Sequence, residues 1–385
     1  MRLAIVTPYP PEISGVGQYG WNMAHWLAGA AALDTIAVIA PKSRGSPAEE
    51  TDGKVCVRRA WSRDDSRAAF HILRAVRSFG ADVAWFNLGL TVFGVAKPAN
   101  LMGFAAPALT RSFGIPSAVT LHEIIQGAQL TEIGLKNGRL TGWGGRAAIR
   151  MILNADVVCL TLKGYVDRIE REYGARNLVH LPHGAFSPPE LVPLPDEPGG
   201  ILAFATFAPY KGLPCLLEAF RELRAGDAGI RLTIAGVDHP RFPGYLERIR
   251  GEAGEMDGVR WLGRVEEPAV REVFGAASIV VVPATATTGA SSVVHRAAAL
   301  GRPIVASDLP DLRRLADEEG LWLAFVPPAD ARALARTLRS LLADESLRLA
   351  MARRNLEAMR SMTIDHTGGR YLSIFRALAD GRDGH

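Results

Sequence analysis

The chain has 385 residues, of which 48% are hydrophobic and 22% are charged, and its formal net charge is +4. This composition is typical of a folded globular protein and excludes a fibrous or disordered chain. No basic run is interleaved with aromatic residues, which argues against a nucleic-acid partner. The three cysteines, Cys56, Cys159 and Cys215, show no CxxC spacing. They fit a reducing cytoplasm and predict neither a zinc site nor a disulfide framework.

The sequence predicts neither an export signal nor a membrane-spanning helix. Met1 and Arg2 run straight into a strand-like stretch. The longest apolar region, 88–109, is broken by polar residues and falls short of the roughly 20 clean residues that a membrane span needs. We therefore expect a cytoplasmic protein. A basic face could still touch anionic lipid, so peripheral contact with the inner face of the membrane stays open.

Short β-rich apolar runs alternate with longer amphipathic runs along the chain. This alternation predicts α/β domains with parallel sheets covered by helices on both faces. In the first half we expect helices that include 66–79 and 163–173, and strands at 3–7, 35–40, 54–59, 82–87, 117–121, 157–161 and 177–181.

A proline-rich segment follows, and a second alternating series begins directly after it. Its predicted helices include 213–225, 268–277, a long helical region at 330–362 and a last amphipathic stretch at 371–378. Its predicted strands are 201–207, 231–236, 259–262, 278–283, 303–307 and 321–325. We expect four parts: an N-terminal domain (1–187), a linker (188–200), a C-terminal domain (201–362) and a C-terminal helix (363–385) that packs back on the N-terminal domain.

Ligands of doubly wound sheets bind at the carboxyl ends of the strands, so the loops there should carry the chemistry. The first strand runs into the turn TPYPPEISGVGQY, residues 7–19. Its glycines allow close backbone approach, and a helix start near Gly17 would offer N–H groups to an anion or a polar substrate. The pattern is not GxGxxG and does not support a dinucleotide site. The alternative is that these glycines only make a tight strand-to-helix turn.

Lys211 stands where the first strand of the second series gives way to a helix, in FATFAPYKG, residues 204–212. A lysine at a helix start is unfavourable against the helix dipole. We therefore interpret it as a phosphate-binding ammonium. The alternative is a solvated lysine with no ligand.

The loop PATATTGASS, residues 283–292, leads from a buried strand into a helix that we expect to start near Ser291. Hydroxyls and unpaired backbone N–H groups before a helix suit a phosphate. The alternative is helix capping by Thr288 or Ser291, which needs only one hydroxyl. The run of small and polar residues exceeds what a cap requires and favours the ligand.

Together these motifs resemble the retaining glycosyltransferases of family 4, the glycosyl transferases group 1, along nearly the whole chain. The glycine loop is similar to that family's N-terminal loop, and YKG (210–212) is similar to its K-G pair. VTLHE (119–123) resembles its strand ending in T-x-H-[DE], and LPHG (181–184) stands where it has P-N-G. The C-terminal signature follows in order as VRWLGR (259–264), VVP (281–283) and ALGRPIVAS (299–307).

The resemblance implies the GT-B fold, with two Rossmann-like doubly wound domains facing a central cleft. It implies a nucleotide-sugar or related phosphate-activated donor, a carbohydrate, lipid-linked or small-molecule acceptor, retention of configuration, and no metal or other cofactor. The implied catalytic residues are His122, near the reacting sugar carbon, and Lys211, which would neutralise the diphosphate. For His122 a structural hydrogen bond at a strand end is the alternative.

The resemblance also implies the remaining site residues. The donor-binding set is Gly15, Val16, Gly17, Thr206, Gly212, Arg264, Thr288, Gly289, Ala290, Ser291, Ser292 and Arg296, beside Lys211. The acceptor-side set is Tyr19, Glu123 and His183.

Three positions depart from the family pattern. Thr206 stands where the family has arginine, and Thr288 and Arg296 stand where it has two glutamates, for sugar hydroxyls and ribose. Arginine only donates hydrogen bonds and cannot replace a carboxylate that accepts them. Arg264 and Arg296 would instead restore positive charge, which suggests a donor recognised more through phosphate than through ribose.

These departures keep a non-catalytic glycosyltransferase-like protein open as an alternative function. A GT-B epimerase would need paired carboxylates and histidines, for which only His122, Glu123 and His183 are candidates. A dinucleotide-dependent oxidoreductase lacks its glycine fingerprint and ribose-binding acid here. The acceptor loops, 88–100 and 126–145, do not identify the acceptor. Exposed apolar residues in them would indicate a lipid-linked one, and the second loop, around Trp143, could form a lid.

Overall fold

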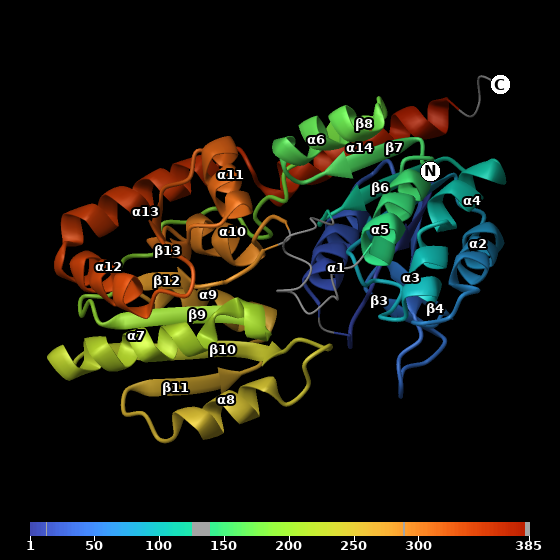
Figure 1. The fold of residues 1–385 in the computed structure, drawn as a ribbon. Coiled ribbons are helices and arrows are strands. Elements are labelled where there is room, and N and C mark those ends of the chain that lie inside the picture. Colours follow the sequence, from blue (N-terminus) through green and yellow to red (C-terminus); the bar gives the residue numbers. More distant parts are fainter. Residues whose placement is uncertain (13, 125–138, 288, 382–385) are drawn as a thin grey trace. The chain divides into compact units, whose positions relative to one another are not determined.

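The computed structural model describes residues 1–12, 14–124, 139–287 and 289–381 (Figure 1). Two compact units are present, and each is described by itself. The N-terminal unit runs to His183 and takes in the chain again from Ile364 on, and the C-terminal unit runs from Gly184 to Thr363. No described helix is long and apolar enough to cross a membrane.

The N-terminal unit is built on an eight-stranded sheet with the order β3-β4-β2-β1-β5-β6-β7-β8. All pairs are parallel except β3 with β4. Its strands are β1 (Arg2–Val6), β2 (Thr35–Pro41), β3 (Glu49–Asp52), β4 (Val55–Trp61), β5 (Val83–Leu88), β6 (Ser117–Leu121), β7 (Val157–Leu160) and β8 (Leu178–His180). Its helices are α1 (Gly15–Ala28), α2 (Ala68–Phe79), α3 (Lys97–Gly103), α4 (Ala106–Ser112), α5 (Arg139–Ile152), α6 (Lys163–Tyr173) and α14 (Ile364–Asp380).

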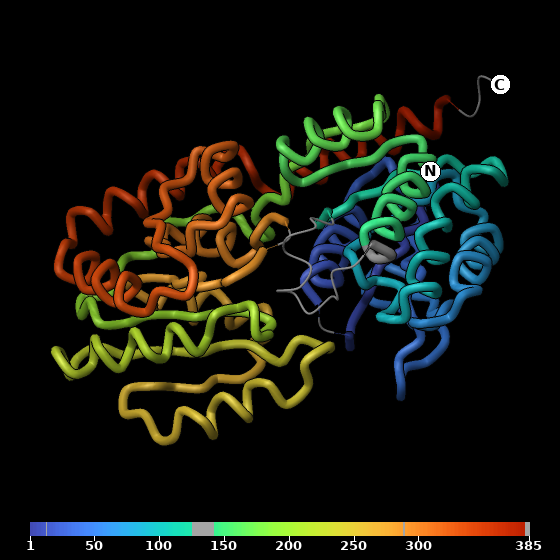
Figure 2. The backbone as a smooth tube through the Cα atoms, in the orientation of Figure 1, coloured from blue at the N-terminus to red at the C-terminus, as the bar shows by residue number. Residues whose placement is uncertain are grey.

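The central strands of this sheet are buried on both faces, which explains their near-continuous apolar sequences. Helices α3 and α4 each contact both α2 and α5, whereas α1 packs against α14 (Figure 2). Tyr371 and Phe375 of α14 are fully buried, and both rings contact Trp85 of β5. The C-terminal helix is therefore part of the N-terminal unit's core.

The C-terminal unit is built on a six-stranded, fully parallel sheet with the order β11-β10-β9-β12-β13-β14. Its strands are β9 (Gly200–Phe207), β10 (Arg231–Asp238), β11 (Val259–Gly263), β12 (Ile279–Val282), β13 (Ile304–Ser307) and β14 (Leu323–Val326). Its helices are α7 (Leu213–Gly226), α8 (Tyr245–Ala253), α9 (Glu267–Gly275), α10 (Ser292–Ala299), α11 (Pro310–Glu319), α12 (Ala331–Ala343) and α13 (Glu345–Met359). Helix α12 packs on α7 and α13 packs on α10.

The predicted linker packs on the C-terminal unit through one buried side chain. Arg302 is fully buried and donates to the carbonyls of Val192 and Pro193 from one nitrogen and to that of Ala277, at 3.0 Å, from another. Burial lowers the pKa of Arg302 to about 10. The carbonyl oxygens offset the cost of burying this charge, so the linker has a fixed course along the domain.

The structure corrects the predicted elements in several places. Strand β3 was not predicted, because its sequence EETD is polar and it forms only the antiparallel edge of the sheet. Helices α3 and α4 lie in a region predicted as a broken apolar run and an uninformative loop. Helix α5 begins at Arg139, so the last part of the predicted lid is helical; residues 126–138 of that lid lie outside the described residues.

The C-terminal helices also differ from the prediction. The long helical region is divided at Asp344, whose carboxylate accepts from the N–H of Leu347 and caps α13. Helix α14 begins at Ile364, so it extends upstream of the predicted amphipathic stretch 371–378 and lies within the range 363–385 expected for the C-terminal helix. Its two adjacent glycines lower helix propensity. Gly368, however, packs against the Trp26 ring so closely that no larger residue fits, and this packing overrides the propensity.

Gly212 offers a direct test of how tightly the C-terminal unit is built at the start of α7. It has a φ of +72°, and a Cβ there would lie far inside the van der Waals distance of the Pro283 carbonyl oxygen. Gly244 has a similar φ of +76° with open space around it. We expect Gly244→Ala to cost about 1–2 kcal/mol, the cost of the left-handed conformation alone. Gly212→Ala should cost about 4 kcal/mol or more in urea unfolding. Equal costs would contradict the close contact.

Candidate functional site

In the C-terminal unit, Lys211 lies in a short 3₁₀ turn, η1 (Pro209–Lys211), between β9 and α7. The turn closes by a hydrogen bond from the Lys211 N–H to the Ala208 carbonyl. Gly212 follows in the left-handed conformation and starts α7. The Lys211 ammonium lies 5.5 Å from the centre of the Tyr210 ring. The sequence thus places this lysine at the carboxyl end of a buried central strand, as predicted.

The loop after β12 packs directly on this turn. The Thr285 N–H donates to the Tyr210 carbonyl at 2.9 Å, and Gly212 lies against Pro283. The loop then reaches α10, where the Ser291 hydroxyl accepts from the Val294 N–H and caps the helix. Gly289, with a φ of +141°, provides a backbone conformation that side chains disfavour. Two loops that are distant in sequence are therefore held together.

A hollow lies at the carboxyl ends of β9 and β12. Its lining includes Lys211, Ser291, Ala205, Phe207, Pro283 and Val293. Lys211 and Ser291 bring an ammonium and a helix N-terminus to one small, mostly apolar recess. An ammonium and the N–H groups of a helix N-terminus are the groups that bind a phosphate.

The first turn of α10 is fixed by a buried ion pair. His295 Nε2 lies 2.8 Å from a carboxylate oxygen of Glu319, and its Nδ1 lies 2.9 Å from the Ser291 carbonyl. Because both ring nitrogens face acceptors, both carry a proton. Burial lowers the pKa of His295, but the Glu319 carboxylate and the hydrogen bonds raise it, and the net direction is upward.

Arg264 and Arg296, predicted to bring positive charge to the donor, each have an acidic partner. Arg264, which follows β11, is 2.5 Å from Glu266. Arg296 is buried on α10 and makes two hydrogen bonds to Glu267, at 2.7 and 2.9 Å, while it lies over the Phe186 ring. The consecutive carboxylates of Glu266 and Glu267 thus balance the two arginines, so Arg264 and Arg296 add little net positive charge.

The Arg296–Glu267 pair can be compared with an exposed pair on the same domain. Arg296→Ala leaves the Glu267 carboxylate beside a buried site without its partner, so we expect a loss of about 2–3 kcal/mol of unfolding free energy. Arg271→Ala, which breaks the exposed pair with Glu190, should cost less than about 1 kcal/mol. Urea titration of both variants checks the difference. A cost for Arg296→Ala no larger than for Arg271→Ala would show that the buried pair is not structural.

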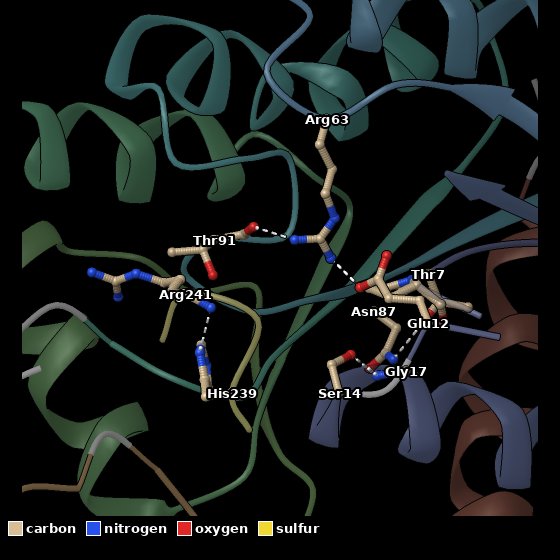
Figure 3. A network of polar contacts seen from close by, with 10 residues as sticks. Thr7, Glu12, Ser14, Gly17, Arg63, Asn87, Thr91, His239 and Arg241 are labelled. Atoms are coloured by element: carbon tan, nitrogen blue, oxygen red, sulfur yellow. Dashed lines mark hydrogen bonds and ion pairs between the residues drawn. The ribbon is translucent and has the colours of Figure 1, made fainter. Parts of the chain in front are cut away.

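In the N-terminal unit the glycine loop forms the start of α1. The helix begins at Gly15, two residues before the predicted Gly17, and the Ser14 hydroxyl accepts from the Gly17 N–H at 3.0 Å (Figure 3). A Cβ at Gly17 would press on Ser14 and Pro8, whereas Gly15 faces open space. Arg63 pairs with Glu12 and also donates to the Thr91 carbonyl, which joins this loop to the one after β5 (Figure 3).

A hydrogen-bond chain connects the glycine loop to His122. Asn87 donates to the Thr7 hydroxyl at 2.9 Å and to the Val16 carbonyl at 2.8 Å, and Thr7 in turn lies within reach of the Pro8 carbonyl (Figure 3). The two carbonyls can only accept, so the Asn87 side-chain oxygen must face His122, 2.6 Å away. His122 therefore carries its proton on Nε2 and leaves Nδ1 as an acceptor.

His122 lies next to two of the predicted acceptor-side residues. The Tyr19 ring is 4.6 Å from the His122 ring and 4.7 Å from the His183 ring, centre to centre. Tyr19 donates to Tyr371 of α14, whose hydroxyl also lies 2.6 Å from that of Thr120. The structure thus brings three predicted residues together. Burial lowers the pKa of His122 to about 4, so its ring is neutral near pH 7.

The other predicted residues are spread over both units. Glu123 accepts from the Leu90 N–H and holds the loop after β5. Thr206 is half-buried in β9 and is not among the residues that line the hollow. Thr288 lies outside the described residues. Sequence reasoning missed Asn87, Thr7 and Tyr371; the one available signal was a polar Asn87 at the end of an otherwise apolar strand.

The neutral state of His122 gives a pH dependence with a defined sign. Its folded pKa of about 4 lies below the ordinary histidine value of 6.5, so the unfolded chain binds more protons between these two pH values and stability falls as pH drops. Between about pH 7 and about pH 5 this one group should remove about 2 kcal/mol. We expect the difference in unfolding free energy between wild type and His122→Gln to change by that amount across the two pH values. Parallel profiles would show that His122 is not buried as a neutral ring.

Comparisons with known proteins bear on the fold and on the sequence motifs of the chain. Solved structures define the class of fold: the sucrose-phosphate synthase of Thermosynechococcus elongatus matches 99% of this chain and 99% of its own, at 17% identity and a TM-score of 0.76. The Anabaena protein HepE, solved with UDP and glucose, matches 98% of this chain and 99% of its own, at 15% identity and a TM-score of 0.70. The predicted α/β fold of the GT-B class is therefore confirmed.

Sequence comparison matches part of the chain to a known family. Residues 198–344 match the family described as glycosyl transferases group 1, so the predicted resemblance to that family is confirmed. A phosphatidyl-myo-inositol mannosyltransferase of Mycobacterium leprae is 26% identical over 219 residues, which is 55% of this chain and 57% of that protein. The chain spans about half the length of the curated relatives that it matches first.

Proposed function

We propose that this protein is a glycosyltransferase that takes its sugar from a donor bound through phosphate at the hollow of the C-terminal unit. One observation carries the proposal: Lys211 and the capped N-terminus of α10 line the same recess, within the segment that matches the group 1 family. An ammonium and a helix N-terminus stabilise the negative charge that builds on a leaving diphosphate. The related fold of HepE was solved with UDP, which supports a nucleotide-sugar donor.

The proposed reaction breaks the bond between the sugar's anomeric carbon and the phosphate oxygen and forms one to an acceptor hydroxyl. The hydroxyl proton passes to the leaving phosphate, so the protein needs no general base. We propose retention of configuration and no requirement for a metal ion, since charge on the leaving group is met by Lys211 and the α10 N–H groups. His122 offers a neutral ring whose Nδ1 can accept from a sugar or acceptor hydroxyl.

Recognition of the nucleoside should differ from that of a site with a ribose-binding carboxylate. Arg296 occupies the position of that carboxylate and is itself held by Glu267. We therefore propose that the contacts of Lys211 and the α10 N–H groups with phosphate supply most of the donor affinity. Binding should then discriminate only weakly between nucleosides.

Removal of the Lys211 ammonium tests the donor site. We expect Lys211→Ala to weaken donor binding about tenfold to a hundredfold, because a charge-assisted contact to phosphate is lost. Isothermal titration with UDP-, GDP- and ADP-sugars measures this, and an EDTA arm tests the proposed metal independence. Lys163→Ala, at an exposed lysine paired with Asp167 in the N-terminal unit, is the matched control. If no nucleotide sugar or polyprenyl-phosphate sugar binds the wild type, the proposal fails.

The Arg296–Glu267 pair favours a second candidate, a glycosyltransferase-like protein that binds a donor without transferring it. Donor hydrolysis without an acceptor separates the two functions. Slow hydrolysis that Lys211→Ala abolishes supports the enzyme. Donor binding without hydrolysis, and without transfer to any sugar, inositol or lipid-linked acceptor tried, supports the binding protein.

A further inference from the structure

A buried ion pair lies one helical turn away from the hollow of the C-terminal unit. His295 is the fourth residue of α10, and its partner Glu319 belongs to α11. Their side chains are 2% and 3% exposed. Ser291 and Val293, at the start of the same helix α10, line the hollow together with Lys211. The pair therefore stands close to the candidate phosphate site without being open to solvent.

Both members of the pair oppose the dipoles of their own helices. His295 brings positive charge to the first turn of α10, and Glu319 is the last residue of α11. A cation is unfavourable at a helix N-terminus, and an anion is unfavourable at a helix C-terminus. Burial adds a desolvation cost, which two apolar side chains of similar volume would avoid. Stability alone therefore gives no reason for this pair. At α10 the positive charge becomes favourable once an anion binds to the helix N-terminus.

The hydrogen bonds of His295 direct its charge onto Ser291. The Ser291 carbonyl accepts from the His295 backbone N–H at 3.2 Å and from the ring Nδ1–H at 2.9 Å. Donation to a carbonyl polarises the peptide group and strengthens the N–H on its other side, that of Ser292. This N–H and that of Val293 have no partner within the helix. The Ser291 hydroxyl accepts from the Val294 N–H at 3.4 Å, so its own proton remains for a ligand.

The charge that acts on the His295 ring comes from Glu319. One carboxylate oxygen of Glu319 lies 2.8 Å from His295 Nε2, and the other is buried without a hydrogen-bond partner in the described part of the chain. Strands β12 and β13, which pack on α10, carry no charged residue. The other buried charged groups of α10, α11 and α13 have partners of their own: Arg296 pairs with Glu267, Asp311 with Arg314, and Arg348 with the Leu341 and Leu342 carbonyls.

We propose that His295 and Glu319 are positioning residues of the donor site, which hold and polarise the start of α10 so that Ser291 and Ser292 bind a diphosphate. The imidazolium adds the positive charge that Arg264 and Arg296, each held by a carboxylate, do not supply. This inference rests on the proposed function and adds to it two residues that do not touch the donor themselves.

Titration with inorganic diphosphate tests the pair. The double variant His295→Leu, Glu319→Leu removes both charges and keeps the buried volume, so it should fold. Its diphosphate affinity should fall about tenfold, because a charge beside a helix N-terminus is lost. Arg348→Leu is the matched control: it removes a buried charge from α13 and should lower Tm without changing diphosphate affinity. Wild-type affinity in the double variant would overturn the proposal. Absence of diphosphate binding by the wild type would instead contradict the proposed function, so the two failures can be told apart.

The protonation of His295 in the wild type gives a second readout, which a purely structural pair would not move. Burial lowers the pKa of His295, but the Glu319 carboxylate and the hydrogen bonds raise it, and the net direction is upward from 6.5. The charged ring is thus fully present below pH 6.5 and is lost as pH rises through the folded pKa. Bound diphosphate should raise this pKa further, and diphosphate affinity should fall as pH rises through it.

Nitrogen NMR of the full chain labelled at histidine measures this pKa with and without inorganic diphosphate. The variant His295→Gln assigns the signal, because the resonance that disappears belongs to His295. A higher pKa with diphosphate bound is the expected result. The same pKa in both states, with diphosphate shown to be bound, would overturn the proposal whether or not the double variant folds.

Discussion

The candidate donor site depends on one close backbone contact, that of Gly212 with the Pro283 carbonyl. Two loops leave neighbouring parallel strands there, and each would be free to move without the other. Their contact, with the hydrogen bond from Thr285 to the Tyr210 carbonyl, sets where the Lys211 ammonium and the start of α10 lie relative to each other. A phosphate site formed by two separate elements binds tightly only if both elements are already held in their binding positions before the ligand arrives.

Buried charged groups also help to fix the position of α10 and of the linker in the C-terminal unit. The His295–Glu319 pair fixes the first turn of α10, Arg296 with Glu267 joins α10 to the start of α9, and Arg302 holds the linker. Each of these charged groups is buried at a position where an apolar side chain would cost less free energy of desolvation. Removing one partner of such a pair leaves the other charge exposed to an apolar environment, so the pairs make the geometry of the domain specific.

Much of the fold could be predicted from the sequence, because buried parallel strands have apolar sequences that lie between glycine- and proline-containing turns. Lys211 and the loop to Ser291 could be predicted for the same reason, since they stand at strand ends. The hairpin strand β3 could not be predicted, because an edge strand needs no apolar sequence. The Asn87–His122 hydrogen bond joins two strands that are neighbours only after β5 and β6 have paired. The partners of Arg296 and Arg264 were equally invisible, because ion pairs follow from packing and not from spacing.

The order of the sequence along the N-terminal unit has a consequence for how the chain is made. The pocket bounded by Tyr19, Trp85 and Thr120 is filled by Tyr371, which follows the whole C-terminal unit in the sequence. The C-terminal unit, by contrast, is continuous from Gly184 to Thr363 and is complete earlier. During synthesis the core of the N-terminal unit therefore stays incomplete, without α14, while the C-terminal unit is made and can fold. A nascent chain of this kind needs protection of that apolar face until α14 has been synthesised.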